Sequence, residues 1–189
     1  MKRLKTIVAL GDSLTEGFGI PAEASFPSVL QSLLRSRGHN VSIINQGLSG
    51  DTAWGGKKRL DRYLANKPRP DAVIVELGAN DAIQFTDPWD VEATLDSILQ
   101  RLTELEIPFL LTGMKMLLPA DADYTEAFES IYPKLAERYD PVFYPFFLEG
   151  AFGDPALTLE DGIHPNIRGT ARIAESVLPF AEELLARIP

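Results

Sequence analysis

The chain has 189 residues, of which 45% are hydrophobic and 24% charged, and its formal net charge at pH 7 is −9. This composition is that of a globular protein and excludes collagen-like and intrinsically disordered chains. The negative charge would repel a phosphate backbone, so we expect no nucleic-acid partner. Because the chain has no cysteine, disulfides, thiolate nucleophiles and cysteine-based zinc sites are excluded. The length predicts a single domain over residues 1–189.

The first apolar run of the chain covers residues 7–10. It is too short for the core of a signal peptide or for a membrane-spanning helix, so we expect no integral membrane segment. A cytoplasmic location is expected for the chain as given, and a periplasmic or secreted one if a leader has been removed.

Short apolar runs alternate along the chain with longer amphipathic segments. The apolar runs predict strands over residues 6–10, 41–46, 72–76, 109–113 and 142–144. The first four are mostly continuous apolar stretches, which are typical of strands buried on both faces of a parallel sheet.

The amphipathic segments between these strands have helical periodicity. They predict helices over residues 26–34, 53–64, 91–105, 128–135 and 167–188. Ser25 is placed to cap the first helix with its side chain, and Gly38 is placed to end it. Pro179 is predicted to break the last helix, because proline has no N–H to donate.

Strands that alternate with helices indicate a parallel sheet covered by helices on both faces. We therefore predict an α/β fold with a three-layer α/β/α sandwich. Ligand sites in open parallel sheets lie beyond the carboxyl ends of the strands. The segments that leave the first three strands, residues 11–14, 47–51 and 77–81, are small, polar and glycine-rich. Chemistry is expected where they meet.

The two histidines of the chain lie in different surroundings. His39 lies between a helix and a strand, in an ordinary turn that favours a structural role. His164 lies just before the last helix, and Asp161 precedes it across a turn that contains Gly162. There the carboxylate can accept a hydrogen bond from the imidazole Nδ1–H, which leaves Nε2 free as a base. The alternative is a turn before a helix that contains Asp and His without a chemical role.

Ser13 follows Gly11 and Asp12 at the end of the first predicted strand. A serine hydroxyl is a weak nucleophile unless a base takes its proton, and His164 is the candidate base. Serine is also a common helix cap, so a structural cap for a helix beginning near Leu14 is the alternative.

An acyl carbonyl under attack develops negative charge on its oxygen, which requires fixed hydrogen-bond donors. Gly50 offers a backbone N–H in the turn 49–51, where no side chain blocks approach. Asn80 offers its side-chain amide and Ser13 its backbone N–H. The alternatives are an ordinary tight turn at Gly50 and an Asx turn at Asn80.

Together these segments resemble the four sequence blocks of the SGNH hydrolases, also called the GDSL esterase/lipase family. The blocks are residues 11–14 (GDSL), 45–52 (NQGLSGDT), 75–81 (VELGAND) and 161–166 (DGIHPN), in the family's order. The likeness is to the thioesterase I, lysophospholipase and arylesterase branch in particular. Ala79 departs from that branch, which often has a second glycine before Asn80.

The resemblance implies a flavodoxin-like five-stranded parallel sheet and a role for each site residue. Ser13 is implied as the nucleophile, His164 as general base and then general acid, and Asp161 as the residue that orients His164. The N–H groups of Ser13 and Gly50 and the amide of Asn80 are implied as the oxyanion hole. No metal or organic cofactor is needed for this chemistry. The expected reaction is hydrolysis of a small-molecule acyl ester or thioester.

The predicted substrates are short- to medium-chain acyl or aryl esters, with thioesters and lysophospholipids as further candidates. Predicted substrate contacts are Asp12, Leu77, Ile83, Phe85, Met114, Met116, Leu117 and Leu118. Ordinary packing is the alternative for the apolar members of this set.

Two other functions stay open. One is a carbohydrate deacetylase on the same scaffold. The other is a flavodoxin-like module that binds phosphate or flavin, because glycine-rich turns beside a parallel sheet also cradle phosphates. Neither Gly-x-x-x-x-Gly-Lys-Ser/Thr nor Gly-x-Gly-x-x-Gly occurs in the chain, which weakens the second.

Overall fold

The computed structural model describes residues 3–189 and contains one parallel sheet. Its strands are β1 (Lys5–Gly11), β2 (Val41–Gly47), β3 (Ala72–Val75), β4 (Phe109–Thr112) and β5 (Val142–Tyr144). They lie in the order β2-β1-β3-β4-β5, which is the flavodoxin-like order. Each strand agrees with its predicted range to within about one residue at either end, the usual uncertainty of such boundaries. The predicted fold class is confirmed.

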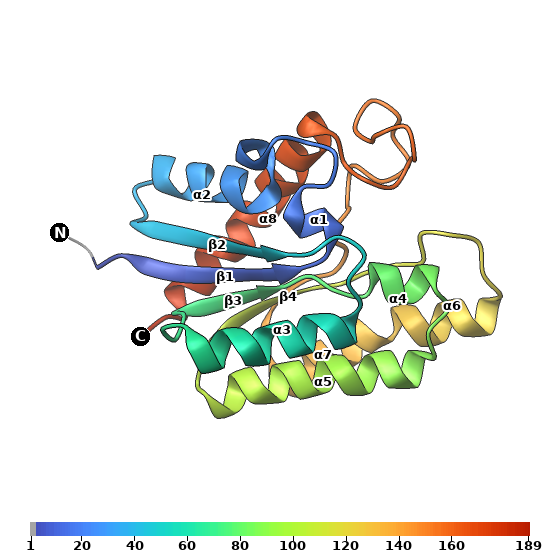
Figure 1. Ribbon diagram of the computed structural model, residues 1–189, viewed down its shortest axis with the longest axis horizontal. Helices are drawn as coiled ribbons and strands as arrows, with labels where there is room; N and C mark the ends of the chain where they lie inside the picture. The colour runs from blue at the N-terminus through green and yellow to red at the C-terminus, as the bar shows by residue number, and fades with distance from the viewer. Residues whose placement is uncertain (1–2) are drawn as a thin grey trace.

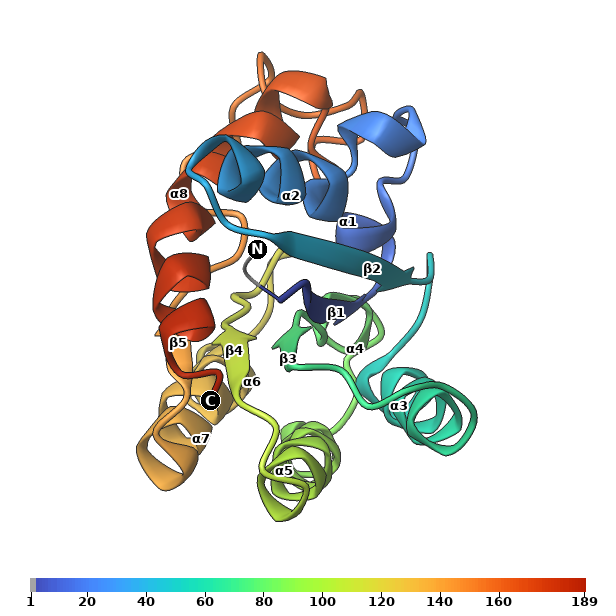
Figure 2. The same cartoon turned by 90° about the vertical axis from the view of Figure 1, so that its left-hand side faces the viewer.

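Helices cover both faces of this sheet (Figures 1 and 2). On one face, α2 (Phe26–Ser36) packs against α8 (Ile167–Ala186). On the other face lie α3 (Ala53–Asn66), α5 (Pro88–Glu104) and α7 (Ile131–Tyr139). The short elements are α1 (Ser13–Glu16), the 3₁₀ turn η1 (Ala22–Ala24), α4 (Ala79–Ile83) and α6 (Ala122–Glu129). Within residues 3–189, no helix has the length and apolar character needed to cross a membrane.

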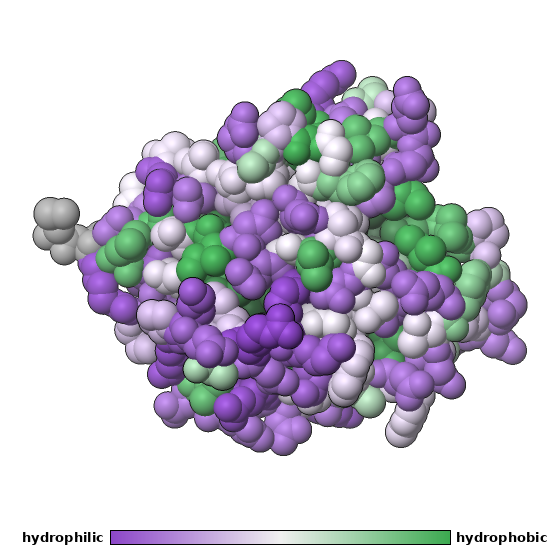
Figure 3. Space-filling view, in the orientation of Figure 1, coloured by the Kyte–Doolittle hydropathy of each residue, from purple (hydrophilic) through white to green (hydrophobic). Residues whose placement is uncertain are grey.

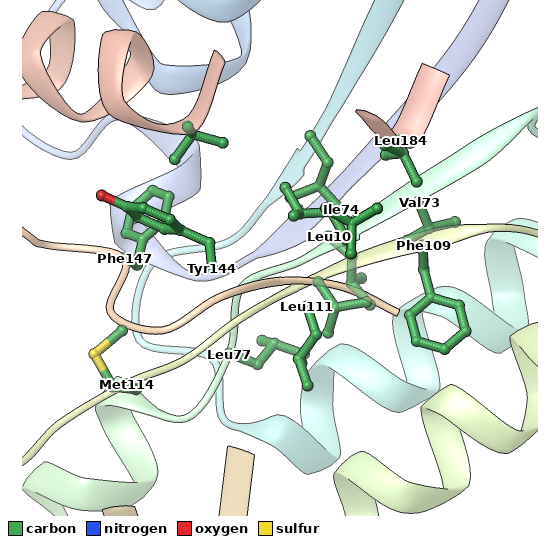
Figure 4. Close-up of a cluster of buried hydrophobic side chains, with 14 of the residues drawn as sticks. Leu10, Val73, Ile74, Leu77, Phe109, Leu111, Met114, Tyr144, Phe147 and Leu184 are labelled. Carbon is green, nitrogen blue, oxygen red and sulfur yellow. The ribbon is translucent and has the colours of Figure 1, made fainter. Parts of the chain in front are cut away.

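The core is built from the apolar strands and the helix faces that cover them. Leu10, Ile74 and Leu111, from three neighbouring strands, and Leu184 of α8 are all buried (Figure 4). Leu10 and Leu111 lie on one face of the sheet, and Ile74 lies on the other face, which α8 covers. Each strand therefore has packed side chains on both faces, as its continuous apolar sequence requires. This packing fixes the strand ends, and the loops beyond the carboxyl ends start from fixed points.

The amino-terminal cap of α2 differs from the prediction. Ser25 is the N-cap residue, but its side chain accepts no hydrogen bond from the helix backbone. Its hydroxyl instead donates to the carbonyl of Ala22 at 2.7 Å and lies 3.0 Å from the hydroxyl of Ser28. The preceding turn η1 supplies a nearer acceptor than the helix does, so the predicted side-chain cap is wrong.

Two predicted helix boundaries are also wrong. The segment predicted as one helix over 128–135 belongs to two helices, which meet at Ser130. Pro133 has no N–H for the carbonyl of Glu129, so the ladder of hydrogen bonds is interrupted there. Conversely, α8 runs unbroken through Pro179. Buried residues on both sides of this proline pack into the same layer and outweigh the missing hydrogen bond.

Candidate active site

The segments that carry Ser13 and His164 come together at the carboxyl-terminal edge of the sheet (Figure 1). Ser13 is the first residue of α1, directly beyond β1, and His164 lies in the loop between β5 and α8. The Oγ atom of Ser13 is 2.9 Å from the Nε2 atom of His164, although 151 positions separate the two residues in the sequence. The hydroxyl and the imidazole are therefore within hydrogen-bonding reach.

Asp161 holds the other nitrogen of the imidazole. Its Oδ2 atom is 2.5 Å from His164 Nδ1, and its Oδ1 atom accepts the backbone N–H groups of Ile163 and His164 at 2.9 Å each. Gly162 makes this tight turn with a φ of 71°, in the left-handed region that glycine adopts readily. A proton on Nδ1 facing the carboxylate leaves Nε2 as an acceptor for the Ser13 hydroxyl.

The hydrogen bonds at Asp161 also favour its charged form. Partial burial opposes ionisation, but the hydrogen bonds from the His164 ring and from the backbone N–H groups of Ile163 and His164 outweigh it. Together they lower the pKa of Asp161 below its ordinary value. The carboxylate that faces the imidazole is therefore ionised at neutral pH.

Two residues that the sequence analysis missed hold this loop in place. The ring of Phe18 packs against the His164 imidazole, with 4.5 Å between ring centroids. Asn166 caps α8 by accepting the N–H groups of Arg168 and Gly169, and its amide donates to the loop carbonyls of residues 156 and 158. Asn166 lies in the last sequence block, where its capping position was a usable signal. Phe18 carried no such signal.

The structure changes the role expected for Ser13 in helix capping. Asp12 is the N-cap of α1, and its Oδ1 atom accepts the N–H of Leu14 at 2.9 Å. The predicted alternative of a capping Ser13 is therefore wrong. No hydrogen bond within residues 3–189 engages the backbone N–H of Ser13, which leaves that donor open.

The turn that follows β2 presents a second open donor. Gly50 has a φ of 79°, and the N–H of Asp51 donates to the carbonyl of Leu48 at 3.1 Å to close the turn. In the part of the chain that the structure describes, the N–H of Gly50 has no acceptor. Both backbone donors predicted for the oxyanion hole are thus available to a ligand.

The predicted third donor, the amide of Asn80, already has partners. Its Nδ2 atom lies 2.9 Å from the carbonyl oxygen of Asp51 and 3.2 Å from Oδ2 of Asp12. An amide nitrogen carries two hydrogens, so both are engaged. Asn80 links the Gly50 turn to the end of β1, and it must share or release one of these bonds to donate to a substrate.

A pair of buried carboxyl groups, Asp12 and Glu76, lies next to Ser13. Asp12 and Glu76 are both fully buried, and Glu76 Oε2 accepts the hydroxyl of Thr15 at 2.7 Å. Burial raises the pKa of Asp12 to about 7, helped by the nearby charge of Asp81 and opposed by the bonds from Leu14 and Asn80. Burial and the charge of Asp12 also raise the pKa of Glu76 well above its ordinary range.

The raised pKa of Asp12 predicts a pH-dependent stability. Asp12 keeps its proton to about pH 7 in the folded chain, against an ordinary value of 3.8, so the folded state binds more protons between these values. This contribution to the free energy of unfolding is therefore present at low pH and is lost as pH rises through the window. We expect wild type to lose stability relative to Asp12→Asn between pH 5 and pH 8.

Urea unfolding of both proteins at the two pH values measures this change, which we expect to be on the order of a few kcal/mol. Asp12→Asn also removes one acceptor of Asn80, but that effect is present at both pH values and cancels in the comparison. Glu160→Gln alters an exposed carboxylate and serves as the control. A stability difference that is the same at pH 5 and pH 8 would contradict the prediction.

The predicted substrate contacts fall into two groups in the structure. Leu77, Met114 and Leu117 are buried in the core, as the packing alternative has it (Figure 4 labels the first two). Asp12 is fully buried and bonded to other protein groups, so the expectation that it touches substrate is corrected.

The second group lies nearer the surface. Phe85 and Leu118 are exposed, and Ile83 and Met116 are partly buried. Figure 3 shows apolar surface at this end of the molecule, over α4 and the loop that follows β4. A cavity of about 450 Å³ lies between α3 and α5 and reaches Asp81 of α4 and Thr86, and none of the predicted contacts lines it.

Comparison with known proteins identifies the family. The model of the GDSL-like lipase/acylhydrolase family matches residues 9–172. A thioesterase 1/protease 1/lysophospholipase L1 of Escherichia coli (strain K12) is 40% identical over 163 residues, 85% of this chain and 76% of that protein. An arylesterase of Vibrio mimicus is 34% identical over 182 residues, 96% of this chain and 89% of that protein.

A solved structure agrees with these matches. The crystal structure of TesA has a TM-score of 0.88 with this chain at 32% sequence identity, covering 95% of this chain and 99% of that one. The family model spans most of the chain and includes Ser13, the turn at Gly50 and the loop that carries His164. The chain therefore belongs to the GDSL-like lipase/acylhydrolase family and is a carboxylic ester hydrolase.

Proposed function

We propose that this esterase acts through an acyl intermediate on Ser13, with His164 as base and Asp161 as the residue that orients it. The observation that carries the proposal is the contact of 2.9 Å between Ser13 Oγ and His164 Nε2. A second contact, of 2.5 Å between His164 Nδ1 and Asp161 Oδ2, links the imidazole to the carboxylate. These two contacts are what a serine nucleophile needs, since one removes its proton and the other fixes the tautomer of the base.

The first half of the proposed reaction forms the acyl-enzyme. Ser13 Oγ attacks the acyl carbon while His164 Nε2 takes the hydroxyl proton. The carbonyl oxygen gains negative charge, which the N–H groups of Ser13 and Gly50 stabilise by hydrogen bonds. The imidazolium then gives its proton to the leaving oxygen or sulfur as the bond to the acyl carbon breaks.

The second half repeats these steps with water. His164 takes a proton from water, whose oxygen attacks the acyl carbon, and the same two N–H groups stabilise the charge again. The imidazolium returns the proton to Ser13 Oγ, and the carboxylic acid leaves. Ionised Asp161 stabilises the imidazolium in both halves without taking its proton.

For the substrate, we propose short- to medium-chain acyl esters and aryl esters, with thioesters and lysophospholipids as further substrates. The exposed apolar side chains of Phe85 and Leu118 support an apolar acyl group. The relatives named arylesterase and thioesterase 1/protease 1/lysophospholipase L1 support the same range. The proposed acyl group lies against this surface while its carbonyl reaches Ser13.

Labelling with a fluorophosphonate tests the nucleophile. We expect wild type to be labelled on Ser13 and Ser13→Ala to be unlabelled. His164→Ala should be labelled at least about 10³-fold more slowly than wild type, because its serine lacks a base. The control is His39→Ala, which changes the histidine far from the site and should label as wild type does. Labelling that persists in Ser13→Ala would remove the proposed nucleophile.

A series of p-nitrophenyl esters from acetate to decanoate tests the substrate class. We expect activity on several members, with a maximum at short or medium chain length. Acetate release from an acetylated sugar, without activity on butyrate or longer esters, would identify a carbohydrate deacetylase instead. No hydrolysis of any ester, together with a visible flavin spectrum, would favour the binding module.

A further inference from the structure

The turn that carries Gly50 is exposed, yet its donor must be fixed for catalysis. Residues 48–50 are all exposed to solvent. A hydrogen-bond donor stabilises a developing charge best when it is already in place before the reaction. The contacts of the residues on either side of Gly50 therefore decide how well its N–H can act.

On one side, the side chain of Glu16 holds the turn. Its Oε2 atom accepts the backbone N–H of Ser49 at 2.7 Å and also the hydroxyl of Ser49 in a short hydrogen bond. Both bonds are charge-assisted, which makes them stronger than bonds between neutral groups. These bonds hold the peptide group before Ser49 and the side chain on its Cα atom. The peptide group that contains the Gly50 N–H starts from that same Cα atom, so its position depends on them.

Glu16 is itself held in place by its backbone. The amide of Asn45 donates to the carbonyls of Thr15 and Glu16 at 3.3 and 3.2 Å. A Cβ atom at Gly47 would lie 2.2 Å from the backbone nitrogen of Glu16, so the end of β2 lies directly against α1. The carboxylate of Glu16 is exposed, but the backbone that carries it is anchored.

On the other side, Arg59 holds Asp51. The guanidinium Nη2 is 2.7 Å from Asp51 Oδ2, and the same group donates to the carbonyl of Gly11 at 2.9 Å. Both side chains of this ion pair are largely buried. Asp51 is therefore tied to the end of β1, and the turn is fixed on both sides of Gly50.

Glu16 differs from Arg59 in what it connects. Glu16 is the last residue of α1, the helix that begins with Ser13. Its bonds to Ser49 therefore join the element that carries the nucleophile and one donor to the turn that carries the other donor. The relative position of the Ser13 and Gly50 N–H groups depends directly on this link.

From this arrangement we propose that Glu16 is a positioning residue for the oxyanion hole, acting through Ser49 on the N–H of Gly50. The inference rests on the proposed function, in which that N–H stabilises the transition state. Because the oxygen is fully charged only in the transition state, loss of this positioning lowers kcat and leaves KM nearly unchanged.

The test compares Glu16→Ala with Glu16→Gln. Losing an oxyanion donor outright lowers kcat by about 10²–10³-fold, so a displaced donor in Glu16→Ala is expected to lower kcat by about 10-fold. Glu16→Gln keeps an oxygen that accepts the Ser49 N–H, so it should stay within about 3-fold of wild type. The matched control is Glu23→Ala, which removes an exposed glutamate of η1 and should leave kcat unchanged.

Hydrogen exchange supplies a readout that does not depend on catalysis. The Ser49 amide is expected to be protected in wild type and in Glu16→Gln, and to exchange about 10-fold faster or more in Glu16→Ala. If the Ser49 amide exchanges at the wild-type rate in Glu16→Ala, the proposed role of Glu16 is wrong. A kcat equal to that of wild type, or a change in KM alone, also contradicts that role. Failure of the proposed function is seen separately, as absence of fluorophosphonate labelling on Ser13 in wild type.

Discussion

Replacing Ser13 with alanine is expected to lower kcat for ester hydrolysis by about 10⁵–10⁶-fold. The variant cannot form the acyl intermediate, because within residues 3–189 no other hydroxyl is bonded to His164 Nε2. The N–H groups of Ser13 and Gly50 stay in place, since the backbone of residue 13 is unchanged by the substitution. Residual activity about 10³–10⁴-fold above the rate in water is therefore expected from these donors and from substrate binding.

The double variant Ser13→Ala/His164→Ala tests whether the two residues act as one catalytic unit or contribute to kcat independently. The base has no function without the nucleophile, so the double variant should be no slower than Ser13→Ala within about 3-fold. Steady-state hydrolysis of p-nitrophenyl butyrate measures kcat of Ser13→Ala, His164→Ala and the double variant. The variants are freshly purified to limit contamination by wild type. A double variant that is about 10³-fold slower than either single variant would show that the two residues act separately.

Replacing Asp161 with asparagine is expected to lower kcat by about 10³–10⁴-fold. Oδ1 of Asp161 accepts two backbone N–H groups, from Ile163 and His164, so the amide oxygen of the variant must occupy that position. The NH₂ group then faces His164 Nδ1, which becomes an acceptor and leaves the proton on Nε2. That tautomer cannot accept the proton of Ser13, although the side chain keeps its shape.

The matched control for this variant is Asp154→Asn. Asp154 lies in the same loop and also accepts a backbone N–H, from Ala156, but no hydrogen bond joins it to the His164 imidazole. It should retain wild-type kcat, and both variants should keep a free energy of unfolding within about 1 kcal/mol of wild type, because neither aspartate is buried. A kcat for Asp161→Asn within about 10-fold of wild type would contradict the proposed role of the carboxylate.

Local sequence determined the strands and much of the site. Continuous apolar runs such as residues 7–10 need burial on both faces, and a parallel sheet covered by helices supplies it. The Asp161 turn is equally local, because a carboxylate three residues before a histidine reaches its Nδ1 across a glycine. The sequence blocks placed Ser13 and Gly50 at the ends of neighbouring strands, which meet at one edge of a parallel sheet.

Tertiary contacts decided the features that the sequence analysis missed or misjudged. Pro179 does not break α8, because burial on both sides outweighs one missing hydrogen bond. Asp12, expected to touch substrate, is buried and caps α1 instead. Phe18 contacts the His164 imidazole, and Glu16 accepts hydrogen bonds from Ser49. Each pair is far apart in the sequence, so no local sequence pattern predicts either contact.

By itself, the sequence therefore determined the order of elements, the fold class and the residue types of the chemistry. It did so because strand burial, turns and hydrogen bonds over three or four residues depend on neighbours in the chain. The tertiary structure alone decided which backbone N–H groups are free, which carboxyl groups are buried and which side chains hold the turn at Gly50. These depend on distances between segments far apart in sequence, such as Ser13 and His164, and such distances exist only once the sheet has formed.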